Sequence, residues 1–483
     1  MKTIHEEREI PVTYECDVLI AGGGTAGVVA AIASARTGAK TMLVEKENFL
    51  GGSLLNGAGP IHSFFNLYQA FPDAKKVQVI RGIPQDIIDR MIRDGGSYGH
   101  LEQEVGGDHD STATLIDREL YKNTANQMVL EEGVHLLLNT WLAGAVCQNG
   151  TISHVIIENK SGRQAIAAKV FIDCTGDADL TAYAGGPFEN LSKQHAVSLP
   201  YALANVDLSR VEAFARETKT LFTVVHHDKG SETDDVVRIG FDMAKVPGMA
   251  VKMYGTNQSS EANDTSEKKE EKAFDFSKVP KYSTFLFGPW GVNYHEKEWG
   301  YVNSNLMMGI DSLNAEDLTR AEVDLHACCV RMTKLLQENI PGFEHCYISW
   351  TPSFLGVRVS RIVDCEYILS EEDIAEGHRF DDEVALYGYH DYAPRIQIRN
   401  GGFYGFPYRS FIPKGMNNLL VAGRLITKDH NAHMSSRNTG GCMVQGHAVG
   451  TAAALAAAED GNVRHVDVEK LKETLRLQGA FLG

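Results

Sequence analysis

Three glycines near the N-terminus have the spacing of a phosphate-binding turn. Gly22, Gly24 and Gly27 fit the pattern G-x-G-x-x-G. In that pattern the first glycine permits a tight turn, the second keeps the backbone open to a pyrophosphate, and the third lets a helix pack closely on the preceding strand. The helix would direct N–H groups, including those of Thr25 and Ala26, and the positive end of its dipole toward the phosphates. The spacing therefore predicts a dinucleotide site.

The elements around the glycines support this prediction, because the pattern alone also occurs in ordinary tight turns. Residues 17–20 form a short apolar strand, residues 26–36 a helix of small residues, and residues 40–44 a second strand. The second strand leads into Glu45 and Lys46. They lie about twenty residues past the glycines, where a carboxylate can accept hydrogen bonds from ribose hydroxyls.

The composition excludes several classes of partner. The chain has 483 residues, enough for two or three domains, and a net charge of −17 from 46 basic and 63 acidic side chains. Nucleic acid is an unfavourable partner for so acidic a protein. The N-terminal segment lacks a signal-peptide core, and no apolar run approaches the length of a membrane helix. The eight cysteines form no C-x-x-C motif, which favours free thiols and no structural metal. We expect a soluble, cytoplasmic protein with a small-molecule substrate, whose oligomeric state is open between monomer and homo-oligomer.

The order of the predicted strands and helices divides the chain into three parts. Residues 1–186 alternate strand and helix, residues 351–483 return to compact apolar segments, and residues 187–350 form an insertion between them. Helices are expected at 83–93, 115–131 and 315–339, and turns at "QNG" and "KSG" separate successive strands before residue 173. The charged segment 254–278, including 256–275, is expected to be an exposed, mobile loop.

Three separated motifs together resemble one enzyme family. They are "AGGGTAG…VEK…GG", "VFIDCTGDADL" and "LLVAGRLITKDH…SSRNTGGCMVQGHAVGTAAALA". In this combination the chain resembles the FAD-dependent oxidoreductases of the glutathione-reductase-like fold, within the fumarate reductase and succinate dehydrogenase flavoprotein group. The resemblance implies an α/β protein: a Rossmann-like FAD-binding domain of the glutathione-reductase type, formed by residues 1–186 and 351–483, with an inserted α+β substrate domain.

The resemblance also implies which residues bind FAD. A late helix of small residues should pack against a flat partner, either a sheet or a ligand, and its first turn should face the N1–C2=O edge of the flavin. Reduced flavin carries negative charge at that edge, so a helix N-terminus would stabilise it. Besides the glycine turn, Glu45 and Lys46, the implied contacts are Gly52, Ser53, Leu142, Thr175, Asp177, Gly423, Arg424, Gly441, Cys442 and Met443.

Three residues are candidates for the chemistry beside the flavin. His430 and Arg437 occupy positions where the resembling family often has histidine and arginine. A histidine can exchange a proton near neutral pH. His430 is therefore the candidate acid or base, with a purely structural role as the alternative. Arg437 would bind a substrate carboxylate or stabilise reduced flavin. Tyr408 either faces the cavity or lies in the core.

Three other basic residues have less certain roles. Arg358 and Arg361 in "GVRVSR" could reach one anionic group, but anchoring of loops by bidentate pairing is favoured. His433 stands where the family usually has an apolar residue, and no role is assigned to it.

The leading hypothesis is a flavoenzyme that oxidises or reduces a small polar metabolite by hydride transfer to or from N5 of FAD. An aromatic hydroxylase is an alternative, although that family places its "GDAAH"-like motif late in the chain, whereas "TGDADL" comes early here. A tRNA-modifying flavoprotein would need a basic docking surface, and a non-catalytic flavin-binding protein would have no reducing substrate. The chain has no convincing second dinucleotide motif, so direct reduction by NAD(P)H is not expected.

Overall fold

The computed structural model describes residues 2–56, 61–70, 74–105, 110–228, 236–249, 284–292, 295, 297–390 and 398–483. The charged segment 254–278 lies outside these residues, so the expectation of an exposed loop there stays a prediction. Within the described ranges, no helix has both the length and the apolar character that crossing a membrane requires.

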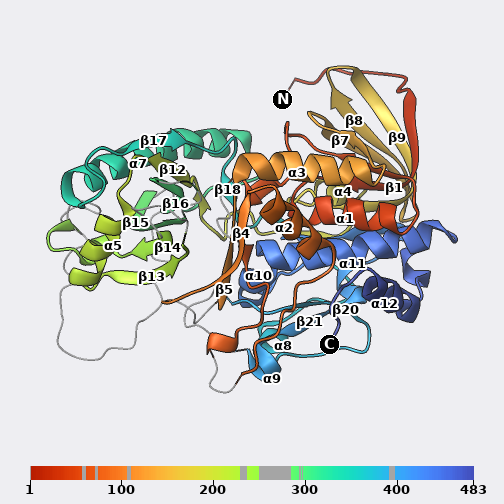
Figure 1. The fold of residues 1–483 in the computed structure, drawn as a ribbon. Coiled ribbons are helices and arrows are strands. Elements are labelled where there is room, and N and C mark those ends of the chain that lie inside the picture. The colour runs from red at the N-terminus through yellow and green to blue at the C-terminus, as the bar shows by residue number, and fades with distance from the viewer. Residues whose placement is uncertain are drawn as a thin grey trace.

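A parallel sheet forms the centre of the larger unit (Figure 1). Strand β1 (Val12–Ala21) lies between β2 (Thr41–Val44) and β9 (Gly162–Asp173), β6 (His135–Leu137) extends the β2 edge, and β22 (Leu419–Val421) pairs with β9. The C-terminal residues of β1, β2, β9 and β22 are buried and, apart from Asp173, apolar, as expected for a sheet covered on both faces. A strand from the last sixth of the chain therefore joins the sheet that begins at the N-terminus.

Two antiparallel strands extend this sheet on the other side of β9. They are β7 (Trp141–Gln148) and β8 (Thr151–Asn159), and they rise above the parallel sheet in Figure 1. Asn149 and Gly150 both have positive φ in the turn between β7 and β8, and Gly162 has positive φ where β9 begins. The turns predicted at "QNG" and "KSG" are confirmed.

A group of helices packs on one another beside the sheet. They are α1 (Thr25–Arg36), α2 (Ile83–Arg93), α3 (Arg118–Glu131), α11 (Thr439–Ala457) and α12 (Val468–Leu477). Of these, α1 and α11 contact the strands of the sheet directly. The predicted helix 83–93 matches α2. The prediction of a helix from residue 115 is wrong at its start, because residues 112–116 form strand β5 and the Asp117 side chain caps α3 by accepting from the Leu120 N–H at 2.8 Å.

Helix α11 packs closely on helix α1, side by side in Figure 1. A Cβ atom on Gly446 would lie 2.2 Å from the carbonyl oxygen of Ala26, and one on Gly450 would lie 2.3 Å from that of Ala30. Only glycine permits this approach of two backbones. The prediction that the small-residue helix needs a flat partner is therefore wrong for its closest contact, which is with another helix.

The inserted segment forms a second unit, the cap, with its own sheet and core. Helices α5 (Leu208–Glu217) and α7 (Ala315–Asn339) cover this sheet, and α7 matches the helix predicted at 315–339. Buried apolar residues of the cap core run from Val197 to Leu355. The cap strands are β11 (Val197–Ser198), β12 (Tyr201–Ala204), β13 (Leu221–His226), β14 (Val236–Phe241), β15 (Thr284–Val292), β16 (Glu298–Met307), β17 (Tyr347–Trp350) and β18 (Gly356–Val357).

The remaining elements are short, and some of them link the two units. The remaining strands are β3 (Ile61–His62), β4 (Ser97–Glu102), β5 (Thr112–Ile116), β10 (Phe188–Asn190), β19 (Arg361–Val363), β20 (Glu383–Tyr387) and β21 (Tyr404–Pro407). The remaining helices are α4 (Asp179–Tyr183), α8 (Glu371–Ala375), α9 (Arg399–Gly402) and α10 (His430–Ser436). The segment after β4 reaches the cap, where the Glu104 N–H donates to the Val224 carbonyl at 3.2 Å. Arg238 of the cap is buried and forms an ion pair with Asp110 at 3.2 Å.

Candidate active site

Three strand ends bring the three sequence motifs to one edge of the parallel sheet. Asp173 at the end of β9 is in register with Ala21 of β1 and Val421 of β22. The Cys174 N–H donates to the Ala21 carbonyl at 2.8 Å, and the Ala422 N–H donates to the Asp173 carbonyl at 3.1 Å. The loops that follow these strands therefore lie side by side, although they are far apart in the sequence.

The three glycines of the first loop have three different structural roles. Gly22 has a φ of +98°, and a Cβ there would lie 2.5 Å from the Cys174 carbonyl oxygen. A Cβ on Gly27 would lie 1.8 Å from the Gly22 carbonyl oxygen. Gly24 has φ −70° and ψ −171°, which any residue adopts, and a Cβ there would meet no atom within 4 Å. Gly22 and Gly27 are thus needed by the fold, whereas Gly24 leaves the loop open to a ligand.

The two long helices that start at this edge have no side-chain cap; the short α4 has none either, but its first turn contains Asp179. Gly24 precedes α1, Asn438 precedes α11, and neither first turn contains an acidic residue. By contrast, an Asp or Asn side chain caps each of α3, α5, α7, α10 and α12. The first N–H groups of α1 and α11 therefore lack a side-chain acceptor, and each helix start suits an external anion or oxygen. Thr25, Ala26 and Gly441 lie in these two first turns.

A second pair of glycines packs directly on the first loop. The Gly51 N–H donates to the Gly23 carbonyl at 2.9 Å. Gly52 has a φ of +54°, and a Cβ there would lie 2.9 Å from the Cα of Gly24. Ser53, the next residue, is exposed. The paired glycines therefore form one wall of the loop at which the sequence predicts a pyrophosphate.

Glu45 connects β2 to the same loop. Its carboxylate is buried and accepts from the Gly23 N–H at 2.5 Å and from the Glu47 N–H at 2.9 Å. A carboxylate oxygen can accept more than one hydrogen bond, so a ribose contact stays a prediction. The neighbouring Lys46 is exposed and lies over the ring of Trp141, 5.4 Å from its centroid, next to the half-buried Leu142.

Asp177 and Arg424 join the second and third motifs. The Arg424 Nη2 donates to the Asp177 Oδ1 at 2.7 Å, and the Ser360 hydroxyl donates to the same oxygen at 2.5 Å. Burial opposes ionisation of Asp177, but Arg424 and Ser360 outweigh it and hold the pKa of this carboxyl below its usual value. The hydroxyl and N–H of Thr175 donate to Asp173 and fix the loop. The Arg424 Nε is a buried donor with no partner in the described residues, so this loop can still donate to a bound group.

The start of α11 is tied to the loop after β22. The Gly423 N–H donates to the Gln445 Oε1 at 2.8 Å, and the Gln445 Nε2 donates to the Ser436 carbonyl at 2.9 Å. A Cβ on Gly441 would lie 2.8 Å from the same Ser436 carbonyl and 3.1 Å from the ring of Tyr387. Tyr387, which the sequence analysis missed, thus lies against the first turn of α11.

Two further residues of this first turn are buried. Burial raises the pKa of the Cys442 thiol to about 12, so it stays neutral near pH 7. Its Sγ lies 3.2 Å from the Arg437 carbonyl oxygen. The side chain of Met443 lies in the core. If Cys442 or Met443 contacts a cofactor, its backbone N–H group is therefore better placed to do so than its side chain.

A cluster of histidines and arginines lies beside the start of α11. The rings of His430 and His195 are stacked, with centroids 4.6 Å apart and planes 4° apart. His433 lies 5.9 Å from His195, and its Nδ1 and Nε2 are each 3.0 Å from a carbonyl oxygen, of Thr427 and Arg358 respectively. Arg437 ends α10 immediately before α11. We call His195, His430, His433, Arg358 and Arg437 the basic cluster.

The basic cluster is formed by three segments, of which the sequence analysis found one. His430 and Arg437 were predicted together, but His195 was missed, and Arg358 was interpreted as a loop anchor. His195 reaches the cluster because β10 pairs with β19 and β11 pairs with β18. These pairs place the segment between β10 and β11 opposite residues 358–360.

Burial and like charge disfavour protonation of these histidines. Burial lowers the pKa of His195, and His430, His433 and both arginines lower it further, to about 2. Burial and Arg437 lower the pKa of His433 to about 3. The pKa of the exposed His430 is lowered by partial desolvation, while Asp429 opposes the effect. The three rings are therefore neutral near pH 7.

Tyr408 is directed away from this cluster. Its side chain is buried, and its hydroxyl donates to the Val463 carbonyl at 2.7 Å. Burial raises the pKa of this hydroxyl far above its usual value. A neutral hydroxyl that is bonded to backbone in the core has a packing role, and the candidate catalytic role of Tyr408 finds no support in these contacts.

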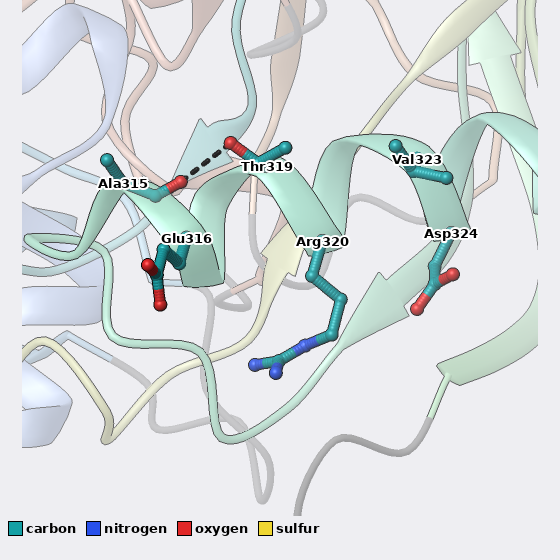
Figure 2. A pocket seen from close by; sticks show the side chains of 6 residues that line it. All are labelled: Ala315, Glu316, Thr319, Arg320, Val323 and Asp324. Carbon is teal, nitrogen blue, oxygen red and sulfur yellow. Dashed lines mark hydrogen bonds between the residues drawn. The ribbon is translucent and has the colours of Figure 1, made fainter.

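A shallow depression on the cap also lies apart from the predicted site. Figure 2 shows its lining side chains, which all come from the first turns of α7. The Thr319 hydroxyl donates to the Ala315 carbonyl at 2.7 Å, and the remaining lining residues are Glu316, Arg320, Val323 and Asp324. None of them belongs to a predicted motif. Nor does any group of three or more His, Cys, Asp or Glu in the described ranges form a candidate metal site.

Comparison with known proteins identifies the family. The family model described as FAD dependent oxidoreductase matches residues 17–475. The chain belongs to the FAD dependent oxidoreductase family. This FAD dependent oxidoreductase shares 31% identity over 163 residues with a mitochondrial dihydrolipoyl dehydrogenase from Schizosaccharomyces pombe, across 34% of this chain and 28% of the relative.

Two further relatives are reductases by name. A digeranylgeranylglycerophospholipid reductase from Thermoplasma volcanium is 21% identical over 201 residues, across 40% of this chain and 48% of the relative. The chain thus spans less than half the length of either curated relative. The structure of a geranylgeranyl bacteriochlorophyll reductase-like protein from Thermoplasma acidophilum aligns with a TM-score of 0.44 and 12% identity, covering 96% of this chain and 82% of that one.

FAD, the cofactor of the family, is compatible with the geometry described above. The uncapped start of α1 and the open face of Gly24 suit its pyrophosphate. The uncapped start of α11 suits the flavin edge, and the unpaired Arg424 Nε offers one more donor. The individual contacts with FAD remain predictions for each residue.

Proposed function

We propose that this FAD dependent oxidoreductase oxidises or reduces a small polar metabolite, with His430 and Arg437 on the substrate side of the flavin. The observation that carries the proposal is the position of α10. Helix α10 follows β22 and the "AGR" residues and precedes the uncapped start of α11. The "AGR" residues and the first turn of α11 are both predicted to contact FAD, so the side chains of α10 lie next to the predicted position of the flavin.

Within this proposal the chain supplies binding, orientation and a proton path. FAD, when bound, accepts or donates a hydride. His430 is exposed and kept neutral by its surroundings, so it can take the hydroxyl proton of a substrate CH–OH group or return a proton to that oxygen. Arg437 stays charged at every working pH and can hold an anionic group of the substrate. The stacked His195 restricts the orientation of the His430 ring.

The test is anaerobic screening of polar metabolites for reduction of the protein-bound FAD. Bleaching of the flavin absorbance by one metabolite class, without reaction with NAD(P)H, supports the proposal. Rapid bleaching by NAD(P)H followed by oxygen consumption would instead favour a flavin hydroxylase, the alternative from the sequence. If the purified protein holds no FAD, the proposal fails at its first step.

We also propose a reducing, cytoplasmic location for the enzyme. The support is the state of the cysteines, all eight of which are free, six of them buried. Disulfides are the rule for cysteine-rich chains in oxidising compartments. Treatment with a thiol-specific reagent before and after denaturation would count the accessible and buried thiols.

A further inference from the structure

One side of helix α7 faces solvent along its whole length. The buried side chains of α7 pack into the cap core. On the opposite side, Val323 is 65% exposed and Val330 is 49% exposed. Ala327, the middle residue of α7, is exposed between them. We call Val323, Ala327 and Val330 the apolar strip. Exposed apolar side chains that are aligned in this way are typical of a surface that contacts another protein.

Six charged side chains border the apolar strip. They are Glu316, Arg320, Asp324, Arg331, Lys334 and Glu338. The helical period of about 3.6 residues places all six on the same side of α7 as the strip. Figure 2 shows three of them along one edge of the helix and Val323 along the other. Arg320 forms an ion pair with Asp317 at 2.7 Å, whereas the other five form no ion pair with any residue that the structure describes. These five charges are therefore available to a partner.

A second copy of α7 that runs antiparallel to the first matches this face. With a twofold axis at Ala327, residues that precede and follow Ala327 by similar numbers of positions face each other. Val323 is four positions before Ala327 and Val330 is three positions after it, so the two valines meet across the axis. Asp324 is three positions before and Arg331 four positions after, so this acid and this base meet beside the valines. By symmetry each of these contacts occurs twice.

The two ends of the face are matched in the same way. Glu316 and Lys334 are 18 residues apart, which is five full turns, so their side chains point in the same direction. In the antiparallel pair, Glu316 of one copy lies about 6 Å along the axis from Lys334 of the other, within reach of these long side chains. Arg320 and Glu338, also 18 residues apart, have the same relationship. A parallel second copy would instead set each charge against its own equivalent.

We propose that this protein forms a symmetric dimer in which the α7 helices of two copies pack antiparallel across a twofold axis at Ala327. A second copy is favoured over a different protein because the face itself supplies both members of each kind of ion pair. The contact is isologous, so it closes at two copies and builds no larger assembly. It involves none of the predicted FAD contacts and no residue of the basic cluster, so the dimer does not depend on the proposed function.

The size of the face indicates a weak dimer. From Glu316 to Glu338 it is about 33 Å long and about 10 Å wide. A strip of this size buries less than the roughly 800 Å² per partner that is usual in stable complexes. Each exposed ion pair changes the Kd by about fivefold at most, and salt weakens its contribution. We therefore expect a Kd in the micromolar range that rises with ionic strength.

Sedimentation velocity of the FAD-loaded protein tests the dimer directly. Samples from about 1 to 200 µM, each in about 50 mM and about 500 mM salt, cover the expected Kd and the change in screening. The sedimentation coefficient should rise with concentration from that of a monomer to that of a dimer, and the rise should need more protein at high salt. A protein that stays monomeric at the highest concentration and low salt would overturn the proposal and leave the face to a different protein. Growth beyond a dimer would overturn it as well.

A substitution at the twofold axis tests the centre of the contact. Ala327→Glu places two carboxylates against each other on the axis, so the variant should remain a monomer at every concentration. Because the position is exposed, the unfolding temperature measured by circular dichroism should stay close to that of the parent. Val323→Glu takes its place if Ala327→Glu does not fold. Dimerisation of the folded variant at the parent Kd would show that the apolar strip is not the interface.

Charge reversal tests the antiparallel register. Asp324→Arg and Arg331→Asp should each weaken the dimer by about tenfold, because each reversal sets like charges together at two symmetric places. The double variant restores opposite charges in exchanged positions, so its Kd should return close to the parent value. Glu322→Arg is the matched control with the same change of charge on the same helix. Glu322 lies away from the strip, 3.6 Å from His326, so this variant should dimerise like the parent. A double variant that dimerises no better than the single variants would refute the register and with it the proposed dimer.

Discussion

Replacement of Gly24 by valine tests the cofactor site with little damage to the fold. The backbone at Gly24 has φ −70° and ψ −171°, and a Cβ there meets no atom within 4 Å, so the protein can accommodate the side chain. The isopropyl group would occupy the space in front of the first turn of α1. Loss of a glycine at this helix start costs about 1 kcal/mol of folding free energy, which a protein of this size tolerates.

The expected loss of FAD affinity is much larger. If a phosphate accepts two N–H groups of α1, at about 1.5–3 kcal/mol each, and the helix dipole adds about 0.3–1 kcal/mol, displacement costs about 3–7 kcal/mol. That corresponds to about two to five powers of ten in Kd. The ratio of absorbance at the flavin band to that of the protein measures occupancy, and circular dichroism of the flavin-free proteins compares their stability.

Gly144→Val is the matched control for the same substitution. Gly144 lies on β7, where a Cβ would make ordinary contacts of 3.6 and 3.7 Å with Ile156. This variant should retain FAD and unfold close to the parent temperature. A soluble Gly24→Val protein at full FAD occupancy would refute the assignment of the first loop to the pyrophosphate. Equal loss of FAD in both valine variants would mean that the substitution acts through general instability.

Three other substitutions have distinct expected outcomes. Gly27→Ala should yield little folded protein even with excess FAD, because its Cβ would lie 1.8 Å from a carbonyl oxygen; the soluble fraction after expression measures this. Arg238→Met should destabilise the protein by about 3–5 kcal/mol, because it removes a buried cation that pairs with the fully buried carboxylate of Asp110. Denaturant unfolding of the FAD-loaded protein checks this value. His430→Ala should retain FAD but slow its reduction by about two to four powers of ten, the usual contribution of an acid or base, as stopped-flow absorbance would show. Reduction at the parent rate would make His430 structural.

The elements around the predicted FAD site could be predicted because the sequence patterns that specify them are short and continuous. Gly22 and Gly27 are recognisable by their fixed spacing. The pattern predicts a tight turn at Gly22 and close packing of the helix at Gly27, and the structure requires glycine at both positions for these reasons. Helices α2 and α7 begin and end where their patterns change. For Gly27 and the two helices, the residues that determine the local structure are neighbours in the sequence. At Gly22 the local requirement is the positive φ, and the carbonyl of Cys174 adds a contact from the loop after β9.

The partner of α11 could not be predicted in the same way. Its sequence of small residues is compatible with close approach to a sheet, a ligand or a helix, since all three need the absence of side chains. The choice depends on Ala26 and Ala30 of α1, which come from the other end of the chain and supply the carbonyls that Gly446 and Gly450 approach. Similarly, "FPYRSF" could not show that the Tyr408 hydroxyl bonds to Val463.

The substrate side depends on pairings that no single motif contains. His195 stacks on His430 only because two short strand pairs, β10 with β19 and β11 with β18, bring the cap against residues 358–360. The basic cluster therefore requires contact between the cap and residues 358–360, whereas the glycine loop is held by Val44 of β2 and by Gly51. Under the proposed function, substitutions at β10 or β11 should therefore change the rate at which substrate reduces the flavin, while FAD remains bound.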